Sequence, residues 1–145
     1  MNPSAASLST LFHEIRTIAV VGMSIKPDRA SFTVADYLQK HGYRIIPINP
    51  SYAGQHILGE HCYATLALAA KALAEAGVKI ELVDCFRKSD AIEPIGSESI
   101  AIGARCLWMQ LGVVNEAAAG KARAAGLEVV MDRCTKIDHA NLYRQ

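Results

Sequence analysis

The sequence predicts an α/β fold in which five parallel strands form a doubly wound, Rossmann-like sheet. Short apolar runs alternate along the chain with longer segments of helical periodicity, the pattern of repeated βαβ units. These runs show no regular polar alternation, as expected for strands whose two faces are both covered by helices. Right-handed crossovers then favour the strand order 3-2-1-4-5.

The strands are predicted where β-branched and other apolar residues cluster between turn signals. Their apolar cores read IAVV, RIIPI, IELVDC, CLWMQ and EVVM. We expect a further short extended piece at residues 56–58, in the loop after the second strand. The five strands are expected at residues 17–21, 44–48, 79–85, 105–111 and 128–131.

Helices are predicted before the first strand and between the others. Gly42, Gly77 and Gly103 follow three of these segments as stop signals, and Asn115 is a predicted cap for the last one. We expect a single domain over residues 1–145, with a core at about 17–132 and a polar tail at 133–145. The helices are expected at residues 9–16, 31–41, 65–76, 91–101 and from 115 onward.

Composition limits the classes of function. The chain has 145 residues, 51% of them hydrophobic and 20% charged, which is typical of a globular domain with a proper core. A net charge of +1 gives no support for nucleic-acid or membrane partners. The four cysteines show no CxxC pair and the five histidines have no metal-ligand spacing. Together with the absence of a signal-like or membrane-length segment, this predicts a cytoplasmic protein without a metal.

The segment after the first strand carries the clearest functional signal. Gly22 ends the strand, a polar loop with Lys26 and Arg29 follows, and a helix is expected to open at Ser31 as its cap. Free N–H groups and the positive end of a helix dipole make such a turn an anion site. The loop therefore predicts a phosphate-bearing, nucleotide-like ligand. The alternative is that Gly22 only makes a tight turn between strand and helix.

The glycine pattern argues against two common nucleotide classes. The dinucleotide fingerprint G-x-G-x-x-G would need further glycines where Ser24 and Pro27 stand. The second strand ends in Asn49 and Pro50, not in the acid that binds the ribose of NAD. The chain also contains no G-x-x-x-x-G-K-[ST] loop.

Ligands of doubly wound sheets bind beyond the carboxyl ends of the strands, and the unusual polar residues of this chain follow those ends. Two cations, Arg87 and Lys88, come after the third strand and would give a second basic cluster at the same crevice. Trp108 lies within the fourth strand, where core packing is the expected role. The other strand-end residues are Asn49, Pro50, Ser51, Asp84, Phe86, Gln110, Gly112, Asn115, Asp132, Arg133 and Cys134.

The chain resembles the small stand-alone CoA-binding proteins with a Rossmann-like fold, which are related to the CoA-binding domain of the succinyl-CoA synthetase alpha subunit. The matching segments are IAVVGMSIKPDRASFTVADYLQKHGYRIIPINP, ILGEHCY, IELVDCFRKSD, AIGARCLWMQLGVVNEAA and GLEVVMDRCTKI. The resemblance implies that coenzyme A binds at the first loop, with adenosine contacts at Pro50 and the loop after the third strand. The expected cofactor-binding residues are Gly22, Met23, Ser24, Lys26, Arg29, Ser31, Asn49, Pro50, Phe86, Arg87 and Lys88.

No catalytic centre is predicted. His139 lies in the expected tail, where a solvated or locally paired histidine is favoured. Cys134 is either a packed residue or a thiol made reactive by Arg133 and Lys136. The sequence thus predicts a binder of CoA or acyl-CoA, and it leaves open a protein partner and self-association. The alternatives are a nucleotide-dependent oxidoreductase and a CoA-transfer subunit that acts with a separate catalytic partner.

Overall fold

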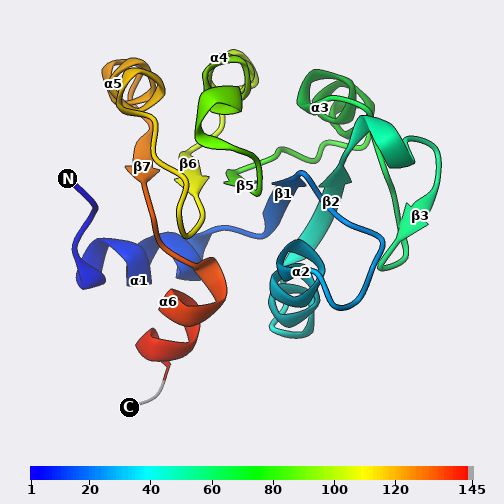
Figure 1. Ribbon diagram of the computed structural model, residues 1–145, viewed down its shortest axis with the longest axis horizontal. Helices are drawn as coiled ribbons and strands as arrows, with labels where there is room; N and C mark the ends of the chain where they lie inside the picture. The colour runs from blue at the N-terminus through cyan, green and yellow to red at the C-terminus, as the bar shows by residue number, and fades with distance from the viewer. Residues whose placement is uncertain (144–145) are drawn as a thin grey trace.

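A computed structural model describes residues 1–143 of the chain, which form a five-stranded parallel sheet between two layers of helices (Figure 1). The sheet order is β2-β1-β5-β6-β7. Two further strands, β3 (His56–Ile57) and β4 (Glu60–His61), make a small antiparallel hairpin. The strands of the main sheet are β1 (Thr17–Val21), β2 (Arg44–Ile48), β5 (Leu82–Cys85), β6 (Cys106–Met109) and β7 (Glu128–Val130).

The predicted fold class is confirmed, and the winding is of the 3-2-1-4-5 type. The chain moves outward from β1 to β2 and then crosses back to β5, which pairs with β1. Beyond β2, a single parallel bridge between Ile48 and Tyr63 occupies the place that strand 3 has in the 3-2-1-4-5 order. The strand expected at residues 79–85 is therefore not outermost. It lies at the centre of the sheet, and the helix that precedes it carries the crossover.

Helices cover both faces of the sheet. Helices α3 (Leu66–Ala74), α4 (Ile92–Ala101) and α5 (Glu116–Ala124) form one layer, with contacts from α3 to α4 and from α4 to α5. Helices α1 (Ala5–Glu14), α2 (Ala30–Lys40) and α6 (Thr135–Leu142) form the other, where α6 contacts both α1 and α2 (Figure 1). Two short 3₁₀ turns, Pro50–Tyr52 and Ser89–Ala91, follow β2 and β5.

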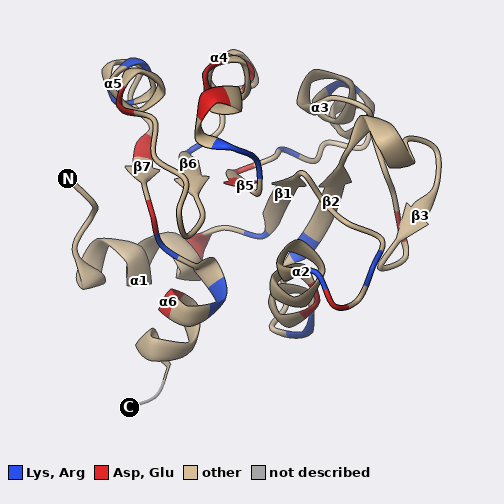
Figure 2. Cartoon of the chain, in the orientation of Figure 1, with Lys and Arg blue, Asp and Glu red and all other residues tan. Residues whose placement is uncertain are grey.

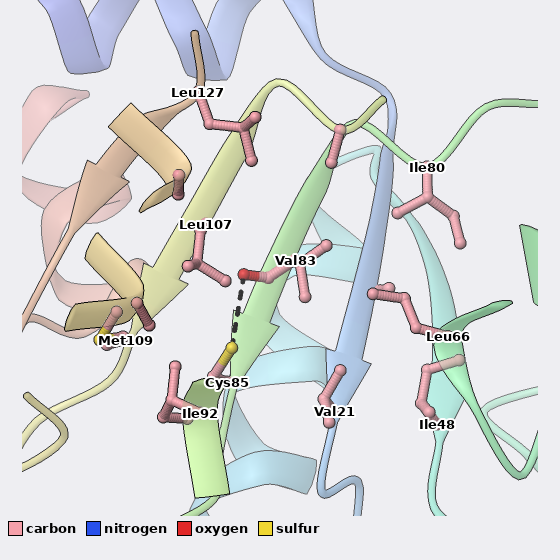
Figure 3. Packing of buried hydrophobic residues seen from close by; sticks show 14 of the residues in the cluster. Val21, Ile48, Leu66, Ile80, Val83, Cys85, Ile92, Leu107, Met109 and Leu127 are labelled. Atoms are coloured by element: carbon pink, nitrogen blue, oxygen red, sulfur yellow. Dashed lines mark hydrogen bonds between the residues drawn. The ribbon is translucent and has the colours of Figure 1, made fainter. Parts of the chain in front are cut away.

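Each strand contributes to two separate cores because its side chains alternate between the faces. In β1, Ile18 and Val20 pack toward α1, α2 and α6, whereas Ala19 and Val21 pack toward α3, α4 and α5. Figure 3 shows the second of these cores, in which Leu66 of α3 approaches Val21 and Ile48. Burial of each such aliphatic side chain contributes about 1.5–3 kcal/mol, so both helical layers are held mainly by the sheet.

The boundaries of several elements differ from the sequence prediction. Strands β1 and β2 have the predicted bounds. Helix α1 begins four residues before the expected Ser9, because the Ser4 hydroxyl accepts a hydrogen bond from the N–H of Ser7 and caps an earlier first turn. Strands β5, β6 and β7 are each shorter than predicted, since apolar residues also continue into the buried loops.

The expected polar tail is wrong for the residues that the structure describes. Residues 135–142 form α6, in which Thr135, Asp138 and His139 are buried. The Arg133 guanidinium donates to both carboxylate oxygens of Asp138, at 2.7 and 2.8 Å, and fixes the first turn. These polar side chains point into the protein, where hydrogen bonds satisfy them. A hydropathy pattern does not reveal such partners. Residues 144–145 of the predicted tail lie outside the described residues.

A buried group of three polar side chains joins α6 to the centre of the sheet. Asp84 of β5 accepts hydrogen bonds from the Gln110 amide at 2.6 Å and from the Thr135 hydroxyl at 2.8 Å. The same amide also donates to the Thr135 hydroxyl. Burial raises the pKa of Asp84 to about 7, although both donors lower it. Asp84 and Gln110 were expected at the open edge of the sheet, and they are buried instead.

We predict that the free energy of unfolding of the Asp84→Asn variant increases relative to that of the wild type as the pH rises. The folded pKa of Asp84 is above its ordinary value of 3.8, so this group contributes most to stability at low pH and its contribution is lost as the pH approaches about 7. Asparagine does not titrate. Between pH 5 and pH 8, the difference in free energy of unfolding measured in urea is expected to move in favour of the variant by on the order of 2 kcal/mol.

The matched control is Asp36→Asn, which makes the same change at a surface ion pair with Lys40. A difference for Asp84→Asn that stays constant with pH, or that moves in favour of the wild type, would show that Asp84 is ionised throughout this range in the folded protein.

Candidate functional site

The candidate site lies at the carboxyl edge of the sheet, around the turn from β1 to α2. The backbone of Gly22 has a φ of +86°, and a Cβ atom there would lie 2.3 Å from the carbonyl oxygen of Phe86. The N–H of Gly22 donates to the Ile48 carbonyl, and the N–H of Phe86 donates to the Val21 carbonyl. Only glycine allows the loops after β1 and β5 to approach so closely. The close neighbour of Gly22 is therefore another loop of the protein.

Hydrogen bonds fold the loop that carries the cations. The Ser24 N–H donates to the Ser31 hydroxyl at 2.9 Å, and the Lys26 N–H donates to the Ser24 hydroxyl at 3.1 Å. The prediction that Ser31 caps the helix is wrong, because α2 begins at Ala30 and Arg29 occupies the cap position without a side-chain bond. Ser31 instead ties the start of the helix back to the loop, which holds the loop open beside the helix N-terminus.

This arrangement leaves a cleft of about 430 Å³, which we call the Ser24 cleft. Lys26 and Arg29 on its rim are exposed, and neither forms an ion pair within residues 1–143. The loop carries these two basic positions on either side of Asp28 (Figure 2). The cleft is lined by Gly22, Ser24, Lys26, Arg29, Ala30, Ser31, Asn49, Tyr52 and Phe86.

The start of α2 supplies backbone donors to the Ser24 cleft. The first hydrogen bond of this helix runs from the Thr33 N–H to the Arg29 carbonyl. The N–H groups of Ala30, Ser31 and Phe32 precede it and therefore have no acceptor within the helix. With the helix dipole, they make the cleft favourable for an anion.

A second hollow, the Arg87 pocket, lies on the other side of Gly22 and has a volume of about 180 Å³. Its walls are mostly apolar, and its polar groups come from Thr65, Arg87 and Glu98. One Glu98 carboxylate oxygen accepts a hydrogen bond from the Ala67 N–H at the start of α3. The pocket is lined by Val21, Gly22, Ile48, Pro50, Ala64, Thr65, Leu66, Arg87, Ala91, Ile95 and Glu98.

Most of the predicted site residues therefore lie around two adjoining hollows. Asn49 holds the edge together, because its amide donates to the Met23 carbonyl and its oxygen accepts from the Ser51 N–H, both at 2.9 Å. Met23 is fully buried, and Lys88 is exposed and lines neither hollow.

Sequence reasoning missed Tyr52, Ala64, Ile95 and Glu98. Glu98 gave no signal, since it lies within a helix whose pattern shows only its buried side. Thr65 was recognised only as a helix start, and its hydroxyl does cap α3 through the Leu68 N–H.

The two residues considered for catalysis lie elsewhere. Cys134 is buried among the side chains of the α1, α2 and α6 layer, and Arg133, expected to activate it, is paired with Asp138. His139 was expected to be solvated or locally paired, but it is 5% exposed and bonds to the Tyr37 hydroxyl of α2, so it is neither solvated nor paired within its own segment. Trp108 has the predicted core role and donates to the Arg133 carbonyl.

Comparison with known proteins identifies the family. A family model described as a CoA binding domain matches residues 16–140. The chain belongs to this CoA-binding domain family. It is 36% identical over 139 residues to the uncharacterized protein YneT of Bacillus subtilis, with 96% of each chain covered.

Solved structures of similar proteins share the whole fold of this CoA-binding domain protein. A hypothetical protein from Pyrococcus horikoshii OT3 is 33% identical, with a TM-score of 0.86 over 97% of this chain and 92% of that one. A Thermus thermophilus protein is 29% identical, with a TM-score of 0.85 over 97% of this chain and all of that one. The family resemblance noted in the sequence is thereby confirmed.

The described residues show neither a metal-binding cluster nor a membrane-spanning helix. Within residues 1–143, no three or more His, Cys, Asp or Glu side chains are grouped so that they could hold a metal ion. Among the same residues, every helix is too short or too polar to cross a bilayer.

We predict that Gly22→Ala destabilises the protein more than Gly54→Ala does. Both glycines have positive φ, +86° and +89°, but a Cβ at Gly54 meets nothing within 4 Å. The backbone strain is thus shared, and the contact with the Phe86 carbonyl is specific to Gly22. Overpacking of this kind costs about 1–3 kcal/mol, which thermal or urea unfolding of the two variants would measure. Equal losses of stability would mean that the Phe86 loop moves away freely.

Proposed function

We propose that this protein binds coenzyme A or an acyl-CoA at the carboxyl edge of its sheet. The observation that carries the proposal is the Ser24 cleft, where the start of α2 meets two exposed cations, Lys26 and Arg29. Membership of the CoA-binding domain family supports the same ligand. The proposal concerns binding and includes no reaction.

The chemistry of the cleft suits a diphosphate. Lys26 and Arg29 supply full positive charges, and charge-assisted hydrogen bonds to phosphate are roughly twice as strong as neutral ones. The N–H groups of the first turn of α2 supply further donors. Among residues 1–143, no acidic side chain lines the cleft, so a ligand with several negative charges meets no repulsion from these walls.

The adjoining Arg87 pocket suits the adenosine end of the same ligand. Its walls include Ile48, Pro50, Leu66 and Ile95, which offer apolar surface to a purine ring. Glu98 is the acceptor available in this pocket for an exocyclic amine, and Arg87 can pair with the ribose phosphate. Because Gly22 lines both hollows, one extended molecule can occupy them together.

The alternative of a nicotinamide dinucleotide is less well supported. A carboxylate after the second strand normally binds the adenosine ribose of NAD. Here Asn49 follows β2, and its amide is already used by Met23 and Ser51. We also propose a cytoplasmic location, which is supported by four cysteines that are all free thiols.

We predict that CoA and acetyl-CoA raise the melting temperature and that NAD does not at the same concentration. A ligand that binds only the folded state stabilises it by about 2.7 kcal/mol at a hundredfold excess over its dissociation constant. Differential scanning fluorimetry with CoA, acetyl-CoA, NAD, NADP and ATP is the measurement. Stabilisation by NAD without stabilisation by CoA would refute the proposed function.

A second prediction assigns the phosphate contacts. Replacement of Lys26 and Arg29 together by glutamine is expected to weaken CoA binding by about 1–3 kcal/mol for each charge removed, as measured by calorimetry. The control is Lys40→Gln, which removes a charge from the far end of α2, where Lys40 is 70% exposed and paired with Asp36. Unchanged affinity in the double variant would place the phosphates of CoA elsewhere.

A further inference from the structure

A third hollow lies outside the proposed CoA site and has no role in it. This His139 pocket has a volume of about 660 Å³, within the range of small-molecule sites, about 300–1,000 Å³. It opens where the last turns of α1 and α2 meet α6. The first turn of α2 lines the Ser24 cleft, whereas Tyr37 near its end and His41 just after it line the His139 pocket. The two sites therefore lie at opposite ends of one helix.

The walls of the pocket are aromatic. Tyr37 of α2 and His41, the residue after this helix, have ring centroids 4.0 Å apart and planes tilted by 30°. His139 of α6 and Tyr143, the residue after this helix, form a similar pair, at 4.6 Å and 33°. The two histidine rings approach to 5.3 Å across the helices. A planar ligand would find ring faces and edges on both helices.

The histidines present unused nitrogen atoms. The Nδ1 atom of His139 bonds to the Tyr37 hydroxyl at 2.8 Å, and Nδ1 of His41 bonds to the Tyr37 carbonyl at 2.7 Å. The Nε2 atoms of both rings have no protein partner within residues 1–143. His139 is 95% buried, yet its Nε2 is not among the sealed unpaired atoms of the described residues. It therefore opens into the pocket, where a ligand can satisfy it.

The charge of the pocket favours an anion. Arg16 supplies the positive charge, and among residues 1–143 no Asp or Glu lines the pocket. Burial and the neighbouring His41 lower the pKa of His139, which favours the neutral form of that ring. The nearby acids are engaged elsewhere, Glu14 with Arg105 and Asp138 with Arg133. One guanidinium nitrogen of Arg16 donates to the carbonyls of His13 and Ile15, which fixes the side chain and leaves its other donors for a carboxylate.

We propose that the His139 pocket binds a planar aromatic carboxylate. Arg16 pairs with the carboxylate, and the rings of His41 and Tyr143 cover the aromatic plane. The Tyr37 hydroxyl donates to Nδ1 of His139, which leaves the Nε2–H of His139 to donate a further hydrogen bond to the carboxylate. This site is independent of the proposed CoA site and needs no residue from it.

Histidine NMR with 2-naphthoate tests the proposal in the unmodified protein. Of the five histidines, His13, His41 and His139 line the pocket, whereas His56 and His61 lie on the β3–β4 hairpin. The imidazole signals of the first three are expected to shift on titration, and those of the hairpin pair are not. The absence of any shift, or equal shifts for all five, would overturn the proposal.

Matched ligands and variants test the chemistry. Neutral 2-naphthamide and the non-planar anion octanoate are each expected to bind at least about tenfold more weakly than 2-naphthoate. Arg16→Gln is expected to weaken 2-naphthoate binding by a similar factor, and Tyr143→Ala, at a half-exposed position, to weaken it independently of Arg16. Lys40→Gln, which removes a cation outside the pocket, is the control. Equal binding of the amide, or full affinity in both pocket variants, would refute the assignment.

Discussion

The approach of Gly22 to the Phe86 carbonyl sets the shape of the carboxyl edge of this sheet. A side chain at Gly22 would have its Cβ 2.3 Å from that oxygen. The loops after β1 and β5 can therefore lie this close only because residue 22 has no side chain. Because the loops meet at this point, the open edge is divided into the Ser24 cleft and the Arg87 pocket. Asn49 then joins the loop after β2 to the same turn through the Met23 carbonyl.

The position of helix α6 depends instead on buried hydrogen bonds. Asp84, Gln110 and Thr135 connect it to the central strand β5 and to the end of β6, and Asp138 connects it to Arg133. Removal of any one partner would leave a buried polar group unpaired, which costs about 1–3 kcal/mol. The same helix closes the His139 pocket against α2. The polar network thus helps to position α6, which carries the His139 ring of that pocket.

The two ends of α2 illustrate how one element can serve separate sites. Its N-terminus offers unpaired N–H groups and the positive end of the helix dipole to an anion. Its C-terminal end offers the rings of Tyr37 and of His41, the residue that follows α2, and the Nδ1–H of His41 donates to the Tyr37 carbonyl. The first property comes from the backbone of any helix start, and the second from particular side chains packed against α6. The anion-binding start of a helix is therefore easier to recognise in a sequence than a pair of aromatic rings that depends on packing.

The sequence by itself determined the fold class, the bounds of β1 and β2, and the cation-bearing loop at Gly22. These are local features, since apolar runs, turn residues and helix starts depend on neighbours in the chain. Only the tertiary structure decided the roles of Asp84, Glu98 and His139, because each is defined by partners more than 25 residues away. The polar face of α6 resembled a solvated tail for the same reason. Hydropathy records that a residue is polar, whereas the fold decides whether water or another side chain satisfies it.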